Sequence, residues 1–457
     1  MKKTFFSIFI LILSLCFAAC EDATLPDLPD MDESMDVDAF EIGDDDETPD
    51  HDSKPAEEND EDGSGNPDSD NTETPDETPD SEIPDSETPD ETPDETEPEP
   101  EIKAAHLLVA TVGGYDVPMS GKVYYAKDEK LADFKEIPVD GGMGSDDGAD
   151  LNVVAFEQGF AVVGRDKSSS LYFFTPEFVF DQEIQIKPDI YINMQDMVYN
   201  PFKDEFVISA LNSDTYDSHQ KYANKIFVLK KGTEPVVSEF KISDNETASP
   251  AKMRIIGKKL FIALQNLNDQ ALSDKGEIAV VDLEDYSVKL IELPIKNPTG
   301  KIEYNAKVDK KHIYFVATGK WQKRDGALLQ MDIDTYEVKK VLSESAEENN
   351  ILDGDFVDVS LADSGEFFII FSNNSSQWEN NLLKYLPKEG KVTKIDSGIN
   401  AFAANPIDFS TLSGKIYYFV DKKSDTYLKS LETKTGKTET VLLDYGPAAL
   451  RVKYDYK

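Results

Sequence analysis

The chain has 457 residues, of which 91 are acidic and 46 are basic, so its formal net charge is -45 at neutral pH. An excess of negative charge this large repels phosphate and argues against a nucleic-acid-binding protein. The only two cysteines, Cys16 and Cys20, both lie within the first twenty residues, so the rest of the chain cannot form a disulfide framework.

Residues 1–20, MKKTFFSIFILILSLCFAAC, have the pattern of a secretory signal peptide, with a basic start and an apolar run from Phe5 to Phe17 that is short for a membrane span. The residues Phe17, Ala18 and Ala19 before Cys20 resemble the lipobox of bacterial lipoproteins. That resemblance implies export and a lipid on Cys20, with the protein anchored in the cell envelope, at the outer membrane or the cell surface. The alternative is an ordinary secreted protein. Acylation of Cys20 would leave no thiol for a disulfide or a cysteine metal site.

Residues 21–103 are dominated by Asp, Glu, Pro and Thr, and the only basic residues are Lys54 and Lys103. From Thr74 to Glu101 the text repeats a Thr-Pro-Asp-Glu unit. A segment with so few apolar side chains cannot bury enough surface to offset the entropy lost on ordering. We therefore expect a disordered, acidic, proline-rich linker that serves as a stalk. The alternative is a segment that condenses calcium or polycations diffusely.

Residues 104–457 have a globular composition and are long enough to bury a substantial core. No helical periodicity is sustained in them, so helices should be minor. Triplets of short strands instead recur about every fifty residues, which is the signature of a radial repeat fold. The triplets open near His106, Gln158, Glu205, Lys258, Lys311, Glu366 and Gly414. Seven units predict an all-β fold, a seven-bladed β-propeller.

One tight turn repeats clearly between two of these units. AVVDLEDYSVKLI (residues 279–291) returns as QMDIDTYEVKKVL (residues 330–342), with an Asp before the turn and Val-Lys after it. The chain resembles the YVTN-type seven-bladed propellers of bacterial surface and periplasmic proteins. The resemblance lies in the segments LFIALQN and GEIAVVDLEDYSVKLIELPI, with IYFVATG and GKIYYFV as weaker copies. Ile262, Ala263 and Leu264 stand where that family has Tyr-Val-Thr-Asn. The family includes adhesion-like, ligand-binding and enzymatic members, so the resemblance implies a fold and no single function.

A fourth strand precedes every triplet except the first. These strands are expected at residues 150–157, 195–200, 251–256, 302–309, 356–362 and 406–412. The segment AALRVKYDY, residues 448 to 456 at the other end of the chain, supplies the missing seventh. We expect this C-terminal strand to complete the first blade and so remove the free sheet edges of an open ring.

The long loops of such a propeller should lie on one face, and function usually resides on loops. The two tryptophans of the protein fall in equivalent long loops of neighbouring blades, where aromatic rings with amide and basic neighbours could stack on a sugar or anchor a protein. The candidate binding residues are Trp321, Gln322, Arg324, Asn373, Asn374 and Trp378, with Tyr216 and His219 in another long loop. The alternative is that each tryptophan ring folds back onto its own blade.

Support for catalysis or metal binding is weak. Asp146, Asp147 and Asp150 resemble half of a calcium site, but the spacing of a dedicated loop is absent and a solvated acidic loop is the simpler reading. No catalytic residue is identified, and no cofactor is expected beyond that calcium. The sequence predicts a membrane-anchored envelope protein whose propeller binds a protein or a glycan. The alternative is a hydrolase or lyase. Its carboxylates, with or without a bound calcium ion, would lie at the central channel.

Overall fold

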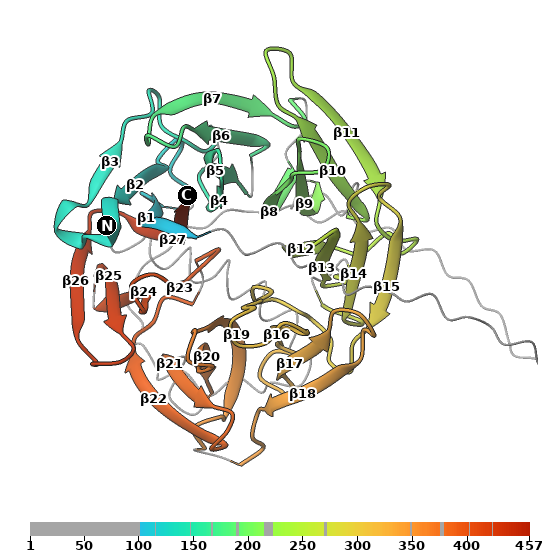
Figure 1. Cartoon of the computed structure of the whole chain (residues 1–457), viewed down its shortest axis with the longest axis vertical. Helices are drawn as coiled ribbons and strands as arrows, with labels where there is room; N and C mark the ends of the chain where they lie inside the picture. The colour runs from blue at the N-terminus through green and yellow to red at the C-terminus, as the bar shows by residue number, and fades with distance from the viewer. Residues whose placement is uncertain are drawn as a thin grey trace, which may run out of the picture. The chain divides into compact units, whose positions relative to one another are not determined.

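The computed structural model describes residues 101–114, 116–146, 148–165, 168–188, 192–213, 223–268, 272–347, 350–374, 379–401, 403–422 and 424–457. Their strands form seven sheets that follow one another around a ring (Figure 1). The predicted all-β, seven-bladed propeller is thereby confirmed. The described residues contain two short 3-10 turns, η1 (Lys127–Glu129) and η2 (Leu131–Asp133), and no α-helix. No helix in this part of the chain is long and apolar enough to cross a membrane.

Each blade runs from an inner strand to an exposed outer strand. The strands, in that order, are β27 (Gly446–Tyr456), β1 (Ile102–Val112), β2 (Lys122–Ala126) and β3 (Lys135–Ile137) in blade one; β4 (Leu151–Phe156), β5 (Gly159–Gly164), β6 (Ser170–Phe174) and β7 (Phe180–Gln185) in blade two; β8 (Ile192–Asn200), β9 (Glu205–Ser213), β10 (Lys225–Lys230) and β11 (Val236–Lys241) in blade three.

The remaining blades follow the same order. They are β12 (Pro250–Ile256), β13 (Lys259–Leu264), β14 (Glu277–Asp282) and β15 (Val288–Glu292) in blade four; β16 (His312–Ala317), β17 (Ala327–Asp332) and β18 (Val338–Ser343) in blade five; β19 (Gly354–Leu361), β20 (Phe367–Asn373), β21 (Glu379–Leu386) and β22 (Lys391–Ser397) in blade six; β23 (Ile407–Ser410), β24 (Lys415–Lys422), β25 (Asp425–Glu432) and β26 (Thr438–Leu443) in blade seven.

The C-terminal strand closes the ring as predicted. β27 is the inner strand of blade one and pairs antiparallel with β1 from Ile102 opposite Tyr456 to Val112 opposite Gly446. His106 on β1 reinforces the pairing, because its Nε2 lies 3.0 Å from Asp455 Oδ2 while its Nδ1 accepts the N–H of Asp128. These contacts hold the two ends of the propeller in one sheet.

Blade five departs from the prediction of a regular strand at residues 302–309. Its inner position is held only by isolated bridges, Pro298 with Ala317 and Glu303 with Tyr314. Pro298 cannot donate to a ladder. Beyond Glu303 the Asn305 side chain accepts the N–H of Lys307 and the chain turns. The predicted strand was wrong because a local turn formed by an asparagine competes with sheet pairing.

The repeated Asp-led turn forms the same structure twice. In each copy the side chain of the first Asp accepts a backbone N–H two residues on, Glu284 for Asp282 and Asp334 for Asp332. In each copy a tyrosine four residues after the Asp takes a left-handed conformation, with φ of 62° at Tyr286 and 64° at Tyr336. The sequence repeat therefore reflects a repeated backbone geometry.

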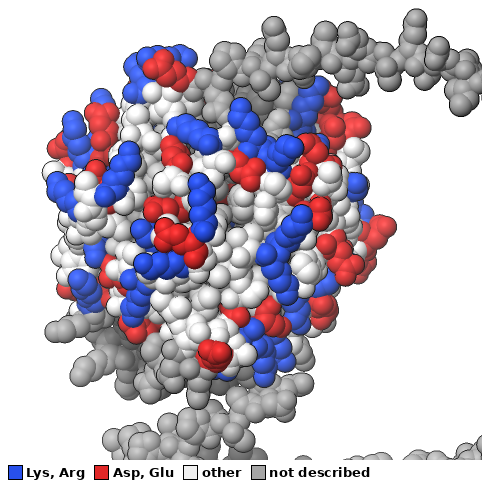
Figure 2. Space-filling model, turned by 60° about the horizontal axis from the view of Figure 1, so that its bottom comes forward, with Lys and Arg blue, Asp and Glu red and all other residues white. Residues whose placement is uncertain are grey.

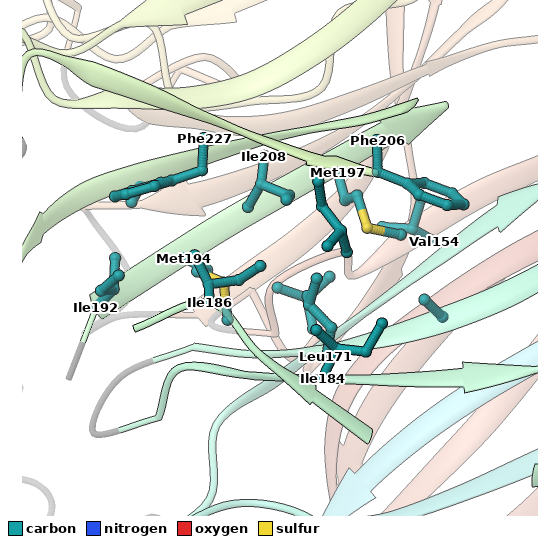
Figure 3. Close-up of a cluster of buried hydrophobic side chains, with 14 of the residues drawn as sticks. Val154, Leu171, Ile184, Ile186, Ile192, Met194, Met197, Phe206, Ile208 and Phe227 are labelled. Atoms are coloured by element: carbon teal, nitrogen blue, oxygen red, sulfur yellow. The ribbon is translucent and has the colours of Figure 1, made fainter. Parts of the chain in front are cut away.

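The core is divided among the junctions between blades. Among the described residues, seven clusters of buried hydrophobic side chains each join two neighbouring blades. Figure 3 shows the cluster between blades two and three, in which Val154 and Leu171 face Met197, Phe206 and Ile208. Removing one blade would expose two such clusters, so stability depends on the complete ring.

The predicted signal peptide, the lipidation site Cys20 and most of the predicted linker lie outside the described residues. β1 begins at Ile102, so the ordered propeller starts two residues before the predicted boundary at residue 104.

We predict that deletion of residues 446–457 abolishes cooperative unfolding or lowers the Tm by about 10 °C or more, because it removes an inner strand and leaves β1 as a free edge. Differential scanning calorimetry of the full chain and the truncated chain measures this. Lys457→Ala is the control: it removes only an exposed ion pair with Glu101, which is worth about 1 kcal/mol at most. An unchanged Tm in the truncated chain would contradict the closure.

Candidate functional site

The loop between β16 and β17, residues 318–326, carries Trp321, whose side chain is half-buried. It joins the second and third strands of blade five, as predicted. Within it Gly319, Gln322 and Arg324 have φ values of 72°, 62° and 56°. A left-handed conformation costs free energy in residues other than glycine, so two of them in one short loop require strong support from their surroundings.

Carboxylates provide the support. Two backbone N–H groups of this Trp321 loop donate to buried acids outside it, Gln322 to Asp355 Oδ1 (2.7 Å) and Gly326 to Glu344 Oε2 (2.8 Å). A third, that of Lys320, donates to Asp325 Oδ1 (2.8 Å), an exposed acid of the loop itself. Hydrogen bonds to an ionised acceptor are roughly twice as strong as neutral ones. These bonds therefore fix the backbone on both sides of Trp321.

Arg324 and Asp353 connect the Trp321 loop to the neighbouring blade. Arg324 Nε donates to Asp353 Oδ1 at 2.5 Å, and Asp353 is fully buried. The backbone carbonyl of Asp353 accepts the N–H of Asn374, which follows β20 of blade six. The structure thus links the Trp321 loop to Asn374, which comes directly after β20.

Only some of the other predicted binding residues are among the residues that the structure describes. Gln322 lies in the Trp321 loop, and Asn373 is the last residue of β20. Trp378, Tyr216 and His219 lie outside the described residues, so their roles stay predictions. Glu344, Asp353 and Asp355 were not predicted as site residues. They follow the Trp321 loop by about twenty to thirty residues, and nothing in the sequence indicates that they contact it.

Two of these carboxylates are strongly perturbed. Burial raises the pKa of Glu344 to about 8 and that of Asp355 to about 7, in spite of the N–H groups that favour their charged forms. Asp355 is fully buried, and its Oδ2 has no hydrogen-bond partner among the described residues. Both groups therefore titrate near neutral pH.

The proposed calcium residues are not brought together by the described structure. Asp150 lies 3.5 Å from Arg165 Nη1, Asp146 is exposed, and Asp147 falls outside the described residues. No group of three or more Asp, Glu, His or Cys in the described part of the chain could hold a metal ion. The weak calcium assignment stays a prediction.

A second candidate site is a cavity of about 610 Å³ at the centre of the ring. This volume lies within the range of small-molecule pockets. Its walls come from the C-terminal halves of the inner strands and from residues 301–307 of blade five. The cavity therefore opens where the short loops between first and second strands begin, on the face opposite the Trp321 loop. The main prediction placed function on the long-loop face, and its alternative placed catalytic carboxylates at the central channel.

Two lysine side chains lie at the end of the cavity that is opposite its opening. Lys252 Nζ donates to the carbonyl oxygen of Ala404 at 2.5 Å, and Lys301 Nζ donates to that of Ile407. Lys301 also lies 3.4 Å from Asp408 Oδ1 and 3.5 Å from Glu303 Oε1. Burial lowers the pKa of Lys252 to about 8 and raises the pKa of Glu303. The cavity thus combines buried amines and carboxylates.

These charges could have been found in the sequence. Most of the predicted first strands carry a charged residue at their second to fourth position. These residues are Asp196, Lys252, Glu303, Asp358, Asp408 and Arg451. Inner strands of a propeller converge on its axis, so charges repeated at that position predict a polar channel.

Charges of both signs lie on the face drawn in Figure 2. Positive and negative side chains are interspersed there, and neither sign forms a continuous field.

Comparison with known proteins supports the fold and goes no further. No family model matches the chain, and no curated protein matches it by sequence. Among solved structures, a candidate 6-phosphogluconolactonase from Bacteroides uniformis is similar with a TM-score of 0.50 at 11% identity, over 76% of this chain and 99% of that one. A second candidate 6-phosphogluconolactonase, from Bacteroides fragilis, has a TM-score of 0.45 at 13% identity, over 76% of this chain and 97% of that one. TolB from Acinetobacter baumannii has a TM-score of 0.40 at 11% identity, over 76% of this chain and 82% of that one. Identities this low show a shared propeller fold alone.

We predict that Asp355→Asn and Glu344→Gln each raise the Tm at pH 8.5 by at least about 2 °C, with a smaller rise at pH 5. The native pKa of each acid is raised above its unfolded value. No ionisation penalty applies below about pH 4, and stability is lost as pH rises from there through the folded values near 7 and 8. The amide side chains keep an acceptor oxygen without the charge.

Thermal melts between pH 5 and pH 9 measure this difference. Glu337→Gln, a change at an exposed acid beyond β17, is the control and should have no effect at either pH. Equal pH dependence in the wild type and both amide variants would show that Glu344 and Asp355 do not titrate as described.

Proposed function

We propose that the chain is an exported protein of the bacterial cell envelope, anchored in the membrane through a lipid on Cys20, whose propeller recognises an envelope or extracellular glycan on its long-loop face. A protein partner is the alternative. The observation that carries the proposal is the Trp321 loop, whose strained backbone is bound by the buried carboxylates of Asp355 and Glu344.

A rigid aromatic loop suits recognition for a physical reason. A loop that is already fixed loses little conformational entropy when a ligand binds, so more of the contact energy appears as affinity. Strain that the surrounding structure maintains is itself a sign of a functional position. The arrangement of Gln322 and Arg324 around Trp321 supports this use.

A glycan is favoured by the chemistry of the loop. A single half-buried indole can stack on the face of a sugar ring while neighbouring amide and basic groups bind its hydroxyls. Asn373 and Asn374 of blade six adjoin the Trp321 loop through Asp353 and add amide groups. Trp378 belongs to the same proposed surface.

The anchoring part of the proposal rests on the leader and the linker. The small residues before Cys20 supply the lipidation signal, and the acidic, proline-rich residues 21–103 would hold the propeller away from the membrane.

A second candidate function is a hydrolase or lyase that acts in the central cavity. The observation that favours it is the pair of perturbed groups there, because the raised pKa of Glu303 suits a general acid and the lowered pKa of Lys252 suits a general base. Assay of the purified chain for new reducing ends or unsaturated products on acidic and neutral polysaccharides tests it, and the absence of product on both would reject it for these substrates.

We predict that a bound oligosaccharide changes the intrinsic fluorescence of the protein, since both tryptophans belong to the proposed surface. Titration with a panel of soluble oligosaccharides built from hexoses, N-acetylhexosamines and uronic acids measures the effect. Trp321→Ala should weaken binding at least about tenfold, which corresponds to ~1.4 kcal/mol.

The control is Phe202→Ala, which removes an exposed aromatic side chain on the opposite face, in the loop between β8 and β9. It should leave affinity unchanged. Equal affinity of the Trp321→Ala variant and the wild type would rule out this loop, and no response to any oligosaccharide would favour the protein partner.

We also predict that treatment of intact cells with the glutamate-specific protease Glu-C releases the propeller by cleavage within the acidic residues 21–103, if the anchor holds the protein at the cell surface. Immunoblotting of the released fraction detects the fragment. A Cys20→Ser variant should lose the membrane association of the wild type. Protection of the propeller until the envelope is broken would place it inside the envelope instead.

A further inference from the structure

The acidic side chains that face the central cavity are largely occupied by backbone N–H groups. Asp196 accepts the N–H of Met197 and, from the next blade, that of Met253. Asp408 is bound in the same manner by Val452 N. Asp358, which is not part of the cavity wall, accepts Lys301 N and Val359 N through its Oδ1. These carboxylates join neighbouring blades, so they offer little to a ligand.

The lysines of the cavity are also engaged. Lys252 and Lys301 bind carbonyl oxygens, Lys307 Nζ donates to Asp363 Oδ2 at 3.2 Å, and Lys453 Nζ lies 2.5 Å from Asp455 Oδ1. Each of these ammonium groups therefore has a hydrogen-bond partner within the protein.

Two arginines differ from all of these groups. Arg254 on β12 makes one side-chain hydrogen bond within the described residues, from Nη2 to the carbonyl oxygen of Tyr304 at 3.2 Å. Arg451 on β27 makes none, and its only ion pair there is a long one, 4.0 Å from Nη1 to Asp408 Oδ2. A guanidinium group has five N–H donors. Most donors of both arginines are thus uncommitted, and both side chains line the cavity.

Glu303 lies with these arginines in the cavity wall. Its Oε1 accepts the hydroxyl of Ser360 at 3.2 Å, and its Oε2 makes no hydrogen bond with a described residue. An oxygen of this kind can accept a hydroxyl of a ligand.

We propose that Arg254 and Arg451 form an oxyanion-binding site in the central cavity, which takes a small hydroxyl-bearing molecule with a carboxylate or phosphate group. The planar guanidinium group of arginine matches the geometry of carboxylate and of phosphate, and it binds either of them through two parallel hydrogen bonds. Glu303 would accept a hydroxyl of the same molecule. Sugar acids and sugar phosphates share this chemistry. The site is independent of the Trp321 loop, which lies on the other face.

Isothermal titration calorimetry of the full chain tests the proposal, with glucuronate, glucose 6-phosphate, inorganic phosphate and glucose as probes. We expect at least one of the sugar anions to bind with a Kd of about 1 mM or tighter and neutral glucose not to bind. Binding of glucuronate alone identifies carboxylates as the natural class, and binding of glucose 6-phosphate alone identifies phosphates. Inorganic phosphate should bind more weakly than the sugar anion, because it lacks the hydroxyl that Glu303 accepts.

Arg254→Gln and Arg451→Gln should each weaken that binding at least about tenfold, and the lysine replacements should retain part of it, because they keep the charge without the fork. Lys434→Gln removes one exposed positive charge outside the cavity and should bind as the wild type does. Trp321→Ala should also have no effect, which separates this site from the proposed glycan surface. Melting curves confirm that each variant is folded.

The proposal is overturned if neither sugar anion binds more tightly than about 10 mM, or if glucose binds as tightly as glucuronate and glucose 6-phosphate. It is equally overturned if both folded glutamine variants bind as the wild type does. If one glutamine variant fails to fold, the affinity of the other glutamine variant decides whether the proposal stands.

Discussion

The pairing of β27 with β1 is the contact on which the rest of the propeller depends. It is the only place where the two ends of the described chain meet in one sheet, and it converts a row of blades into a closed ring without a disulfide. The same strand also places Arg451 and Val452 in the wall of the central cavity. Closure and the cavity are therefore produced by one strand, and the free edges that invite aggregation are removed at the same time.

Buried carboxylates serve two separate purposes in this molecule. On the inner strands, Asp196, Asp358 and Asp408 bind backbone N–H groups of neighbouring blades and fix the spacing of the ring. Beneath the Trp321 loop, Asp355 and Glu344 bind the backbone of a strained surface loop. In both places the buried carboxyl groups accept backbone N–H groups that would otherwise be unpaired. At the loop acids burial outweighs these hydrogen bonds and raises the pKa values to about 7 and about 8, so their support of the loop depends on pH.

Much of the fold could be predicted from the sequence, because strand triplets and turn residues recur at regular spacing. The first triplet lacks a preceding strand, and this alone pointed to the C-terminal segment as its partner. Blade five was the exception: the alternation in IEYNAKV was read as a strand, although Pro298 ahead of it and the side chain of Asn305 within it favour irregular backbone. Local turn chemistry prevailed over the apolar pattern there.

The candidate sites were harder to predict than the fold. Trp321 and Arg324 were identified from composition and loop position, but their support by Asp353 and Asp355 depends on contacts between segments that are distant in sequence. The repeated charges of the inner strands were readable, yet only the structure distinguishes the committed groups from Arg254 and Arg451. Hydrogen-bond commitment is a property of three-dimensional packing, and residue type alone does not reveal it.

The central claim is that the ring holds the Trp321 loop rigidly, and amide hydrogen exchange of the full chain tests it most directly. The account predicts that the amides of Lys320, Gln322 and Gly326 exchange nearly as slowly as those of β16 and β17, and far more slowly than those of the exposed loop at residues 231–234. Exchange in the Trp321 loop as fast as in that exposed loop would contradict the account.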